Sequence, residues 1–344
     1  MPSGPTEAGL LVLSLLVPLA VTLAVMPSYL RSLTGRGRVV DDVHKRPPTK
    51  VPSPVGPVLL LGMVAGELVA YLAFGSLVPL AVAGAAAVAF SVGIADDLFV
   101  LGARTKPLLL LLAAAPLVSL VALEPDLYSS SLTLPLLGDT APHFTIYTVL
   151  VIAAFPIVAN AFNMMDSFNG QLPSFTLLVS LAVLFGMTLR YFYTSGYSLA
   201  HLASALPLTA VAAGFLVFNR YPSKAFDGDS GSLMLGAMFA ALAVTGGIEV
   251  AAMIAMVPAI LNSFYTLSSV RGFVERRRMG SRPTYIGDDG LIYATSDPSA
   301  PTTLVRLILL GGPQSERDLV NSILVLTAAA CVLSVVISVL TWVT

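Results

Sequence analysis

Carboxylate and amide side chains recur at four separated places in this chain, and lysine and arginine residues are interleaved with them. The four groups are Asp41 and Asp42; Asp96 and Asp97; Asn160, Asn163, Asp166 and Asn169; and Asp227 and Asp229. Carboxylate and amide oxygens bind hard divalent cations, whereas lysine and arginine neutralise phosphate oxygens. The pattern therefore indicates a site that holds a divalent metal ion together with a di- or triphosphate-like group.

The spacing within two of these groups adds detail. Asn160 and Asn163 are three residues apart, so they share one face if the segment is helical. Asn169-Gly170 is typical of a turn that brings backbone close to a ligand, or of a simple helix stop. The segment 226–231 places an aromatic residue beside two carboxylates and two glycines. It could stack a base and hold a metal, or it could be an ordinary polar loop, and spacing alone favours neither.

The composition shows which kind of element must position these groups. Of the 344 residues 56% are hydrophobic and 11% charged, and the mean hydropathy is +0.87. Soluble domains carry about 25% charged residues, so lipid must be the solvent for most of this chain. The net charge of −1 gives no sign of a nucleic-acid partner, and we expect none. The single cysteine, Cys331, excludes disulfide frameworks and cysteine-based metal sites.

Ten apolar runs are long enough to be transmembrane helices, which need about 20 residues. The runs cover residues 9–30, 54–74, 77–95, 107–123, 144–162, 172–190, 199–218, 232–246, 247–271 and 319–342. The first run has no lysine or arginine before Arg31, whereas a cleaved secretory signal has a basic segment at its start. We therefore expect a retained first helix and an all-α, polytopic membrane protein.

The orientation follows from the basic residues. Every lysine and arginine except Arg190 falls beside or within the loops that follow the first, third, seventh and ninth runs. Cytoplasmic loops are enriched in lysine and arginine, so these loops are predicted to be cytoplasmic and both termini to lie outside. A charge inside the bilayer is costly, and any one of the carboxylates could be an ordinary helix-end residue. All four polar groups nevertheless fall on the predicted cytoplasmic side, which favours a shared site.

We interpret the chain as one transmembrane catalytic domain, residues 1–344, with a cytoplasmic insertion at 272–318. Within the insertion, Asp289-Gly290 lies between short apolar and β-branched arms, which predicts a β-hairpin.

Five motifs, taken in order, resemble those of a known family. They are Asp42-Val-His-Lys45 with Pro52-Ser-Pro-Val-Gly56; Gly93-Ile-Ala-Asp96-Asp97 with Arg104-Thr-Lys106; Asn160-Ala-Phe-Asn163 running to Asn169-Gly170; Asn219-Arg-Tyr-Pro222-Ser with Phe226-Asp-Gly-Asp229; and Glu275-Arg-Arg-Arg278. They resemble the polyprenyl-phosphate N-acetylhexosamine-1-phosphate transferase superfamily over residues 40–290, and most of all its dolichyl-phosphate N-acetylglucosamine-phosphotransferase branch of eukaryotes and archaea. That family has ten helices and external termini.

The resemblance implies a role for each matching residue. Asn163 and Asp229 would bind Mg²⁺, with Mn²⁺ as an alternative, and Asp96 and Asp97 would lie in the catalytic centre. Lys106 would contact the pyrophosphate of the sugar nucleotide. The residues implied in substrate binding are Asp42, Lys45, Asn160, Asn169, Phe226, Arg276, Arg278 and Arg282. Among them, Asn169 and Phe226 would hold the uracil.

The implied reaction moves N-acetylglucosamine-1-phosphate from UDP-N-acetylglucosamine to a polyprenyl (dolichyl) phosphate and releases UMP, as a first step of lipid-linked oligosaccharide synthesis. The enzyme would act at the cytoplasmic face of the cell membrane or endoplasmic reticulum, with a homodimer as one arrangement. Ser53 stands where the eukaryotic branch has Glu, Ala103 lies near its Trp, and Arg-Arg-Arg replaces Arg-His-Arg. The same reaction with another UDP-N-acetylhexosamine as donor, or with undecaprenyl phosphate as acceptor, therefore stays an open alternative. A secondary transporter is the distant alternative, although its polar residues would lie near the midplane.

Overall fold

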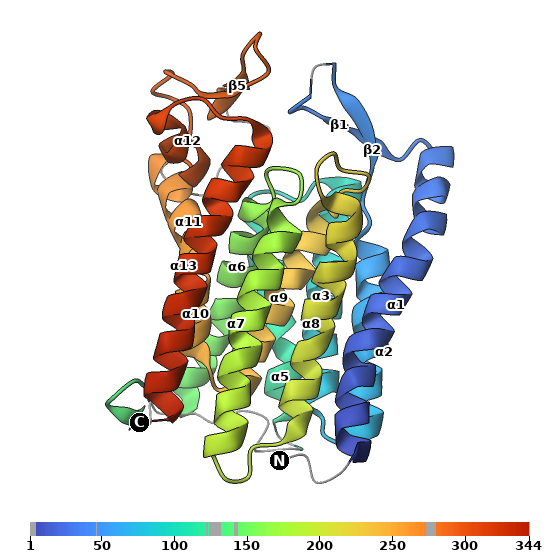
Figure 1. The fold of residues 1–344 in the computed structure, drawn as a ribbon, viewed down its shortest axis with the longest axis vertical. Coiled ribbons are helices and arrows are strands. Elements are labelled where there is room, and N and C mark those ends of the chain that lie inside the picture. The colour runs from blue at the N-terminus through green and yellow to red at the C-terminus, as the bar shows by residue number, and fades with distance from the viewer. Residues whose placement is uncertain are drawn as a thin grey trace.

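The computed structural model describes residues 5–45, 47–121, 123, 132–140, 144–270, 272 and 280–343. The helices run side by side in one bundle, with small hairpins at its ends (Figure 1). Helix α1 (Pro5–Gly35) begins and helix α13 (Glu316–Trp342) ends at the same end of the bundle, opposite the hairpins near residues 40–50 and 285–293. The predicted all-α polytopic class is confirmed, while external termini stay a prediction.

Eight helices of the described chain are long and apolar enough to cross a membrane. Besides α1 and α13 they are α2 (Gly56–Phe74), α3 (Val78–Phe99), α6 (Phe144–Met165), α7 (Gln171–Tyr193), α8 (Leu199–Asn219) and α9 (Gly228–Gly246). Their ends follow local sequence signals. Ser198 caps α8 by accepting the Ala200 N–H, and Gly75 ends α2 with a left-handed φ of 67°.

Two of the ten predicted runs differ from single long helices. The ninth run forms α10 (Glu249–Ala255) and α11 (Val257–Ser269), which meet at an angle of 67° and count together as a possible ninth span. Pro258 lacks the N–H that would continue α10, which accounts for the break. The fourth run forms a shorter segment of α4 (Thr105–Leu110), the 3-10 helix η1 (Leu111–Ala114) and α5 (Ala115–Leu120).

Three antiparallel hairpins connect helices in the described part of the chain. β1 (Val39–Asp42) pairs with β2 (Thr49–Pro52), β3 (Leu132–Leu134) with β4 (Gly138–Thr140), and β5 (Thr284–Ile286) with β6 (Ile292–Ala294). The predicted turn at Asp289-Gly290 is confirmed, because it joins β5 to β6 and Gly290 has a φ of 77°. Beyond it, α12 (Leu304–Ile308) and η4 (Leu309–Gly311) lead to α13. Arg306 holds this insertion together by donating to the carbonyls of Thr295, Asp297 and Ala300.

Helix α9 is the centre of the bundle. In its most apolar stretch 89% of the residues are buried, compared with 22% in α1 at the periphery. It packs along α3 and α6, and the contact with α3 depends on Gly93. A Cβ atom at Gly93 would lie 2.5 Å from the Asp229 carbonyl oxygen and 2.5 Å from the Ser230 Cα. The close approach of these two helices places Asp229 beside the end of α3.

Replacing Gly93 with Ala should therefore displace the start of α9. Overpacking of this kind costs about 1–3 kcal/mol, and we expect a lower thermal midpoint in detergent together with loss of any activity that depends on Asp229. Gly9→Ala in α1 is the matched control, because a Cβ atom there meets nothing within 4 Å. Equal thermal midpoints for the two variants would contradict the close packing of α3 on α9.

Candidate active site

A cluster of charged and amide side chains lies where α3, α4, α6 and α9 meet; we call Asp96, Asp97, Lys106, Asn163 and Asp229 the carboxylate cluster. The Lys106 Nζ lies 3.0 Å from Asp96 Oδ2 and also forms a close ion pair with Asp229 Oδ2. The ammonium group thus bridges two carboxylates that stand 133 positions apart along the chain from each other. The predicted association of Asp96, Lys106 and Asp229 is present in the structure.

Asn163 completes the cluster from α6. Its Nδ2 donates to Asp229 Oδ1 at 2.7 Å and to Ser232 Oγ at 2.8 Å. Because the amide nitrogen is used on these neighbours, the carbonyl oxygen is the atom of Asn163 that can bind a cation. Asn163 and Asp229, the two predicted metal ligands, are therefore in direct contact.

Asp97 makes different contacts from Asp96. Its two carboxylate oxygens accept the backbone N–H groups of Asp229 at 2.8 Å and Ser230 at 3.0 Å. These N–H groups lie in the first turn of α9, where intrahelical partners are lacking and a negative charge is favourable. Asp97 therefore positions the helix that carries Asp229, while Asp96 faces Lys106.

A polar cavity of about 420 Å³ opens on this cluster. It is lined by Gly37, Arg38, Val39, Val40, Ser53, Pro54, Asp96, Asp97 and Asp229. The first six belong to the β1–β2 hairpin and its flanks, so the hairpin covers one side of the carboxylates. The cavity gives a small anionic or metal-bound ligand access to Asp96 and Asp229.

The donor set of this site suits Mg²⁺, which prefers oxygen ligands and is commonly held by one or two carboxylates, with water and substrate phosphates completing its shell. Asp229 and the Asn163 carbonyl offer two such oxygens. Within the described residues, no three His, Cys, Asp or Glu side chains are close enough to hold a metal ion alone. A metal at this site would therefore share its shell with phosphate oxygens of a bound ligand.

A second polar cluster joins the β1–β2 hairpin to the start of α13; we call Asp42, Lys45, Asn169 and Glu316 the hairpin cluster. Asp42 Oδ2 accepts a hydrogen bond from Asn169 Nδ2 at 2.9 Å and lies 3.4 Å from Lys45 Nζ. Glu316 forms a close ion pair with Lys45, and its other oxygen accepts the Asn169 N–H at 2.9 Å. The predicted substrate-binding residues Asp42, Lys45 and Asn169 are thus in contact with one another. Glu316, which was not predicted, binds two of them.

The aromatic ring of Tyr221 extends the hairpin cluster. The Tyr221 ring lies beneath Lys45 Nζ at 4.1 Å and beneath the Arg317 guanidinium at 4.5 Å, and both contacts are cation–π interactions. The predicted turn at Asn169-Gly170 is present, because Gly170 has a φ of 80° and donates its N–H to Asn219 Oδ1 at 2.9 Å.

Asp227 and Asp229, which the sequence could not distinguish, have different environments. Asp227 is fully buried, and neither of its carboxyl oxygens has a hydrogen bond of standard geometry. Burial raises the pKa of Asp227 well above its usual range, and the nearby carboxyl group of Asp166 raises it further. Asp227 is therefore a buried acid behind the cavity, while Asp229 lines it.

Other predicted residues lie outside the two clusters. Asn160 donates to the Pro156 carbonyl one turn earlier on α6, at 2.7 Å. Phe226 is half-buried and pairs through its backbone with Pro52 and Val55 at the base of β2. Arg282 is exposed just before β5. Arg276 and Arg278 lie outside the described residues, so their role stays a prediction.

Sequence reasoning missed Glu316 because the last apolar run was placed at residues 319–342. Ser315 caps α13 by accepting the Asp318 N–H, so the helix begins at Glu316. A serine followed by acidic residues before an apolar run is a helix-start signal that could have extended the helix. Nothing in the sequence pairs Glu316 with Lys45, because that contact depends on how α13 packs.

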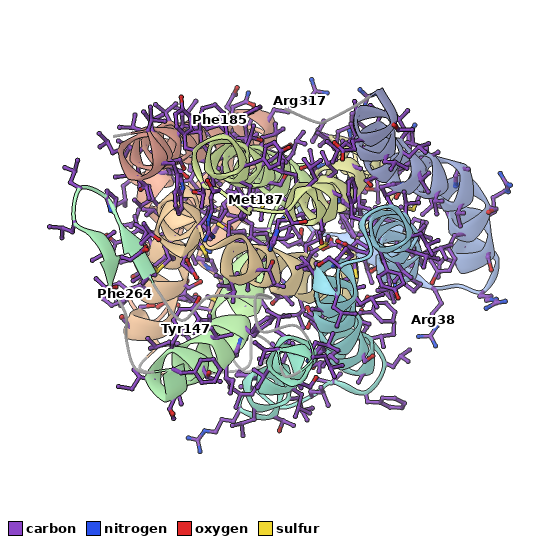
Figure 2. The ribbon with its side chains drawn as sticks, turned by 90° about the horizontal axis from the view of Figure 1, so that it is seen from below. Arg38, Tyr147, Phe185, Met187, Phe264 and Arg317 are labelled. Carbon is purple, nitrogen blue, oxygen red and sulfur yellow. The ribbon has the colours of Figure 1, made fainter. Side chains whose placement is uncertain are left out.

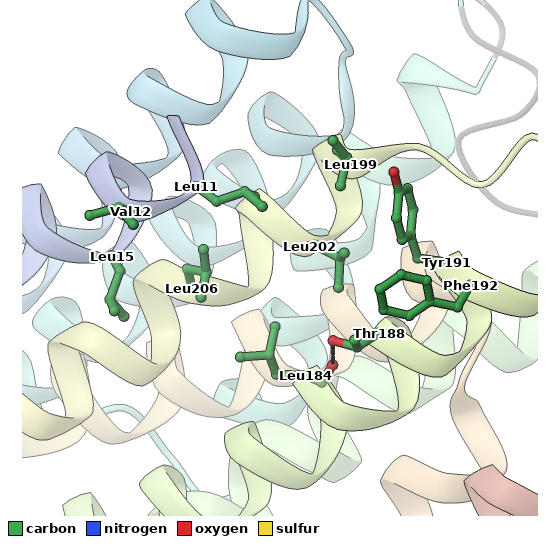
Figure 3. Close-up of a pocket in the computed structure, with 10 residues that line it drawn as sticks. All are labelled: Leu11, Val12, Leu15, Leu184, Thr188, Tyr191, Phe192, Leu199, Leu202 and Leu206. Carbon is green, nitrogen blue, oxygen red and sulfur yellow. Dashed lines mark hydrogen bonds between the residues drawn. The ribbon is translucent and has the colours of Figure 1, made fainter. Parts of the chain in front are cut away.

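An apolar cavity of about 320 Å³ lies between α1, α7 and α8, toward the opposite end of the bundle (Figure 3). Its lining includes Leu15, Leu184 and Leu206. The hydroxyl of Thr188 is used on the Leu184 carbonyl at 2.7 Å. None of the described residues that line it is charged, so the cavity suits hydrocarbon chains better than the phosphate chemistry of the carboxylate cluster.

The chain is similar in sequence to several known proteins. Residues 79–247 match the model of glycosyl transferase family 4. A Sulfolobus acidocaldarius protein with the provisional name UDP-N-acetylglucosamine–dolichyl-phosphate N-acetylglucosaminephosphotransferase is 27% identical over 307 residues, 87% of this chain and 88% of that protein. A Bacillus subtilis protein with the provisional name undecaprenyl-phosphate N-acetylglucosaminyl 1-phosphate transferase is 28% identical over 237 residues, 69% of this chain and 63% of that protein.

A phospho-N-acetylmuramoyl-pentapeptide-transferase of Rhodopseudomonas palustris is 34% identical over 178 residues, 48% of this chain and 47% of that protein. The family match includes Asp96, Asp97, Lys106, Asn163 and Asp229, the whole carboxylate cluster. The resemblance to the polyprenyl-phosphate N-acetylhexosamine-1-phosphate transferase superfamily is thus confirmed by the family match and by the names of the relatives.

Proposed function

We propose that the protein transfers N-acetylglucosamine-1-phosphate from UDP-N-acetylglucosamine to a polyprenyl phosphate of the dolichyl type and releases UMP. The observation that carries this proposal is the carboxylate cluster, in which Asp96, Lys106, Asn163 and Asp229 converge beside a polar cavity at one end of a membrane bundle. The names of the relatives from Sulfolobus acidocaldarius and Bacillus subtilis support a reaction of this class.

In this reaction an oxygen of the lipid phosphate attacks the sugar-linked phosphorus of the donor. The bond from that phosphorus to the oxygen bridging the two phosphates breaks, and UMP leaves with that oxygen. Catalysis of phosphoryl transfer rests on positioning and charge stabilisation. Lys106 neutralises developing charge on the diphosphate, Asp97 fixes the start of α9, and the hydrogen bond from Asn163 to Asp229 holds these two side chains together.

A bound Mg²⁺ would be held by Asp229 and the Asn163 carbonyl, and it would supply Lewis-acid stabilisation of the phosphate oxygens. Asn169 and Phe226 are proposed to hold the uracil, with Asp42 and Lys45 near the donor. The basic loops favour a cytoplasmic site. The product would then serve as the first lipid-linked intermediate of protein N-glycosylation.

The position of the phosphate label tests the reaction type. The purified protein is incubated with UDP-N-acetylglucosamine labelled with ³²P at the β-phosphate and with a polyprenyl phosphate. Transfer of the sugar phosphate puts the label into the lipid, whereas transfer of the sugar alone leaves it in UDP. Label in UDP would contradict the proposed chemistry, and no reaction with any UDP-N-acetylhexosamine would reopen the transporter interpretation.

A further inference from the structure

We propose that the cavity rim at Arg38 binds the phosphate headgroup of the lipid acceptor, and that the exposed apolar end of α3 receives the first part of its tail. The inference rests on the proposed function and adds a subsite to it. The acceptor is an amphiphile with an anionic head, so its site must combine a cation with a lipid-facing apolar surface. Both features lie next to the carboxylate cluster.

The charges around the cavity call for such a cation. Asp96, Asp97 and Asp229 all line it, and Arg38 is the one lysine or arginine among the lining residues of the described chain. A phosphate would be repelled by the carboxylates unless positive charge met it there. Lys106 pairs with Asp96 and Asp229 and is proposed above to meet the donor diphosphate, so the acceptor phosphate needs a second cation. Arginine binds phosphate oxygens through two parallel N–H groups, which would orient the headgroup as well as neutralise it.

Arg38 lies where a lipid would reach the site first. Its backbone is fixed between α1 and the hairpin, because its N–H donates to the Leu33 carbonyl at 2.9 Å and its carbonyl accepts the Ser53 N–H at 3.3 Å. Its side chain is exposed, and Figure 2 shows Arg38 at the edge of the bundle, away from the central helices. A headgroup arriving from the bilayer would meet this guanidinium before the half-buried carboxylates.

Exposed apolar side chains lie in the cavity lining and at the end of α3, directly after Asp96 and Asp97. Val40 lines the cavity and is 46% exposed, and Phe99, two residues after Asp97, is 78% exposed. Leu98 and Val100 are exposed beside it. A sugar nucleotide offers no hydrocarbon to cover such a surface, whereas the isoprene units next to the acceptor phosphate do. The apolar end of α3 therefore favours the lipid acceptor as the occupant.

The test is a kinetic comparison of acceptor and donor. Arg38→Gln should raise the KM for polyprenyl phosphate about 10- to 100-fold, which is the size expected for losing hydrogen bonds to a charged group. The KM for UDP-N-acetylglucosamine should change less than about twofold, and Arg38→Lys should recover part of the loss because it keeps the charge. Arg36→Gln is the matched control, since Arg36 is also exposed but does not line the cavity.

A second pair of variants tests the tail. Phe99→Ser should raise the KM for a long-chain polyprenyl phosphate but not for one with only two isoprene units, while Arg38→Gln should affect both. Leu136→Ser, at an exposed position of the distant β3–β4 hairpin, is the control. An unchanged acceptor KM in Arg38→Gln, or equal rises for donor and acceptor, would overturn the inference. Absence of transfer by the wild-type protein would instead contradict the proposed function.

Discussion

Replacing Asp229 with Asn is expected to reduce sugar-phosphate transfer by about three orders of magnitude, which corresponds to about 4 kcal/mol of transition-state stabilisation. The Asp229 carboxylate pairs with Lys106, accepts a hydrogen bond from Asn163, and is the strongest candidate ligand for a divalent cation in the cavity. An amide keeps the shape of the side chain but loses its charge. The variant therefore removes the electrostatics while leaving the packing of α9 unchanged.

The measurement is the initial rate of lipid labelling by purified protein at saturating donor, with the thermal midpoint recorded to confirm folding. Asp139→Asn in the distant β3–β4 hairpin is the control, because Asp139 is exposed and accepts a hydrogen bond from Thr133 on the neighbouring strand. The control should keep wild-type activity. Retention of more than a tenth of that activity by Asp229→Asn would remove Asp229 from the catalytic site.

Replacing Lys106 with Met should give the second large loss, about 10²- to 10³-fold in rate. Lys106 is the cation that faces both Asp96 and Asp229, and the donor diphosphate is proposed to meet the same ammonium group. Without it, two carboxylates face each other with no positive charge between them. A divalent cation can then neutralise them, so added Mg²⁺ should raise the thermal midpoint of Lys106→Met more than that of the wild type.

This second readout does not depend on turnover, so it separates loss of charge from simple unfolding. Lys224→Met, at an exposed position in the loop before α9, is the matched control and should behave as the wild type in both assays. An equal Mg²⁺ response in Lys106→Met and the wild type would mean that the cation does not bind near Lys106. Wild-type transfer by Lys106→Met would exclude its proposed contact with the diphosphate.

Much of the architecture could be predicted because a membrane imposes a simple rule on sequence. Each span needs about 20 apolar residues, and its backbone N–H and C=O groups must be hydrogen-bonded within the protein. The ten runs therefore all appear as helical segments. The bend between α10 and α11 and the short α4–η1–α5 segment were not predicted. Neither follows from hydropathy, because prolines are tolerated within spans and their effect depends on the neighbouring helices.

Part of the site could also be predicted from the order of the membrane spans. That order placed Asp96, Asn163 and Asp229 on the same side of the membrane, and the structure contains the contact of Asn163 with Asp229. The sequence could not show that Asp227 turns into the protein while Asp229 lines the cavity, because both lie in one polar loop. It also could not show that Glu316 reaches Lys45 from the last helix. Contacts of this kind are set by packing between distant segments.

The most direct test of the account is the release of UMP from UDP-N-acetylglucosamine by the purified protein, measured with each component omitted in turn. The account predicts release only when polyprenyl phosphate and Mg²⁺ are both present, with one lipid-linked sugar diphosphate formed for each UMP. Release of UMP without the lipid would indicate hydrolysis of the donor. Transfer that persists after complete chelation of divalent cations would contradict the proposed metal site at Asn163 and Asp229.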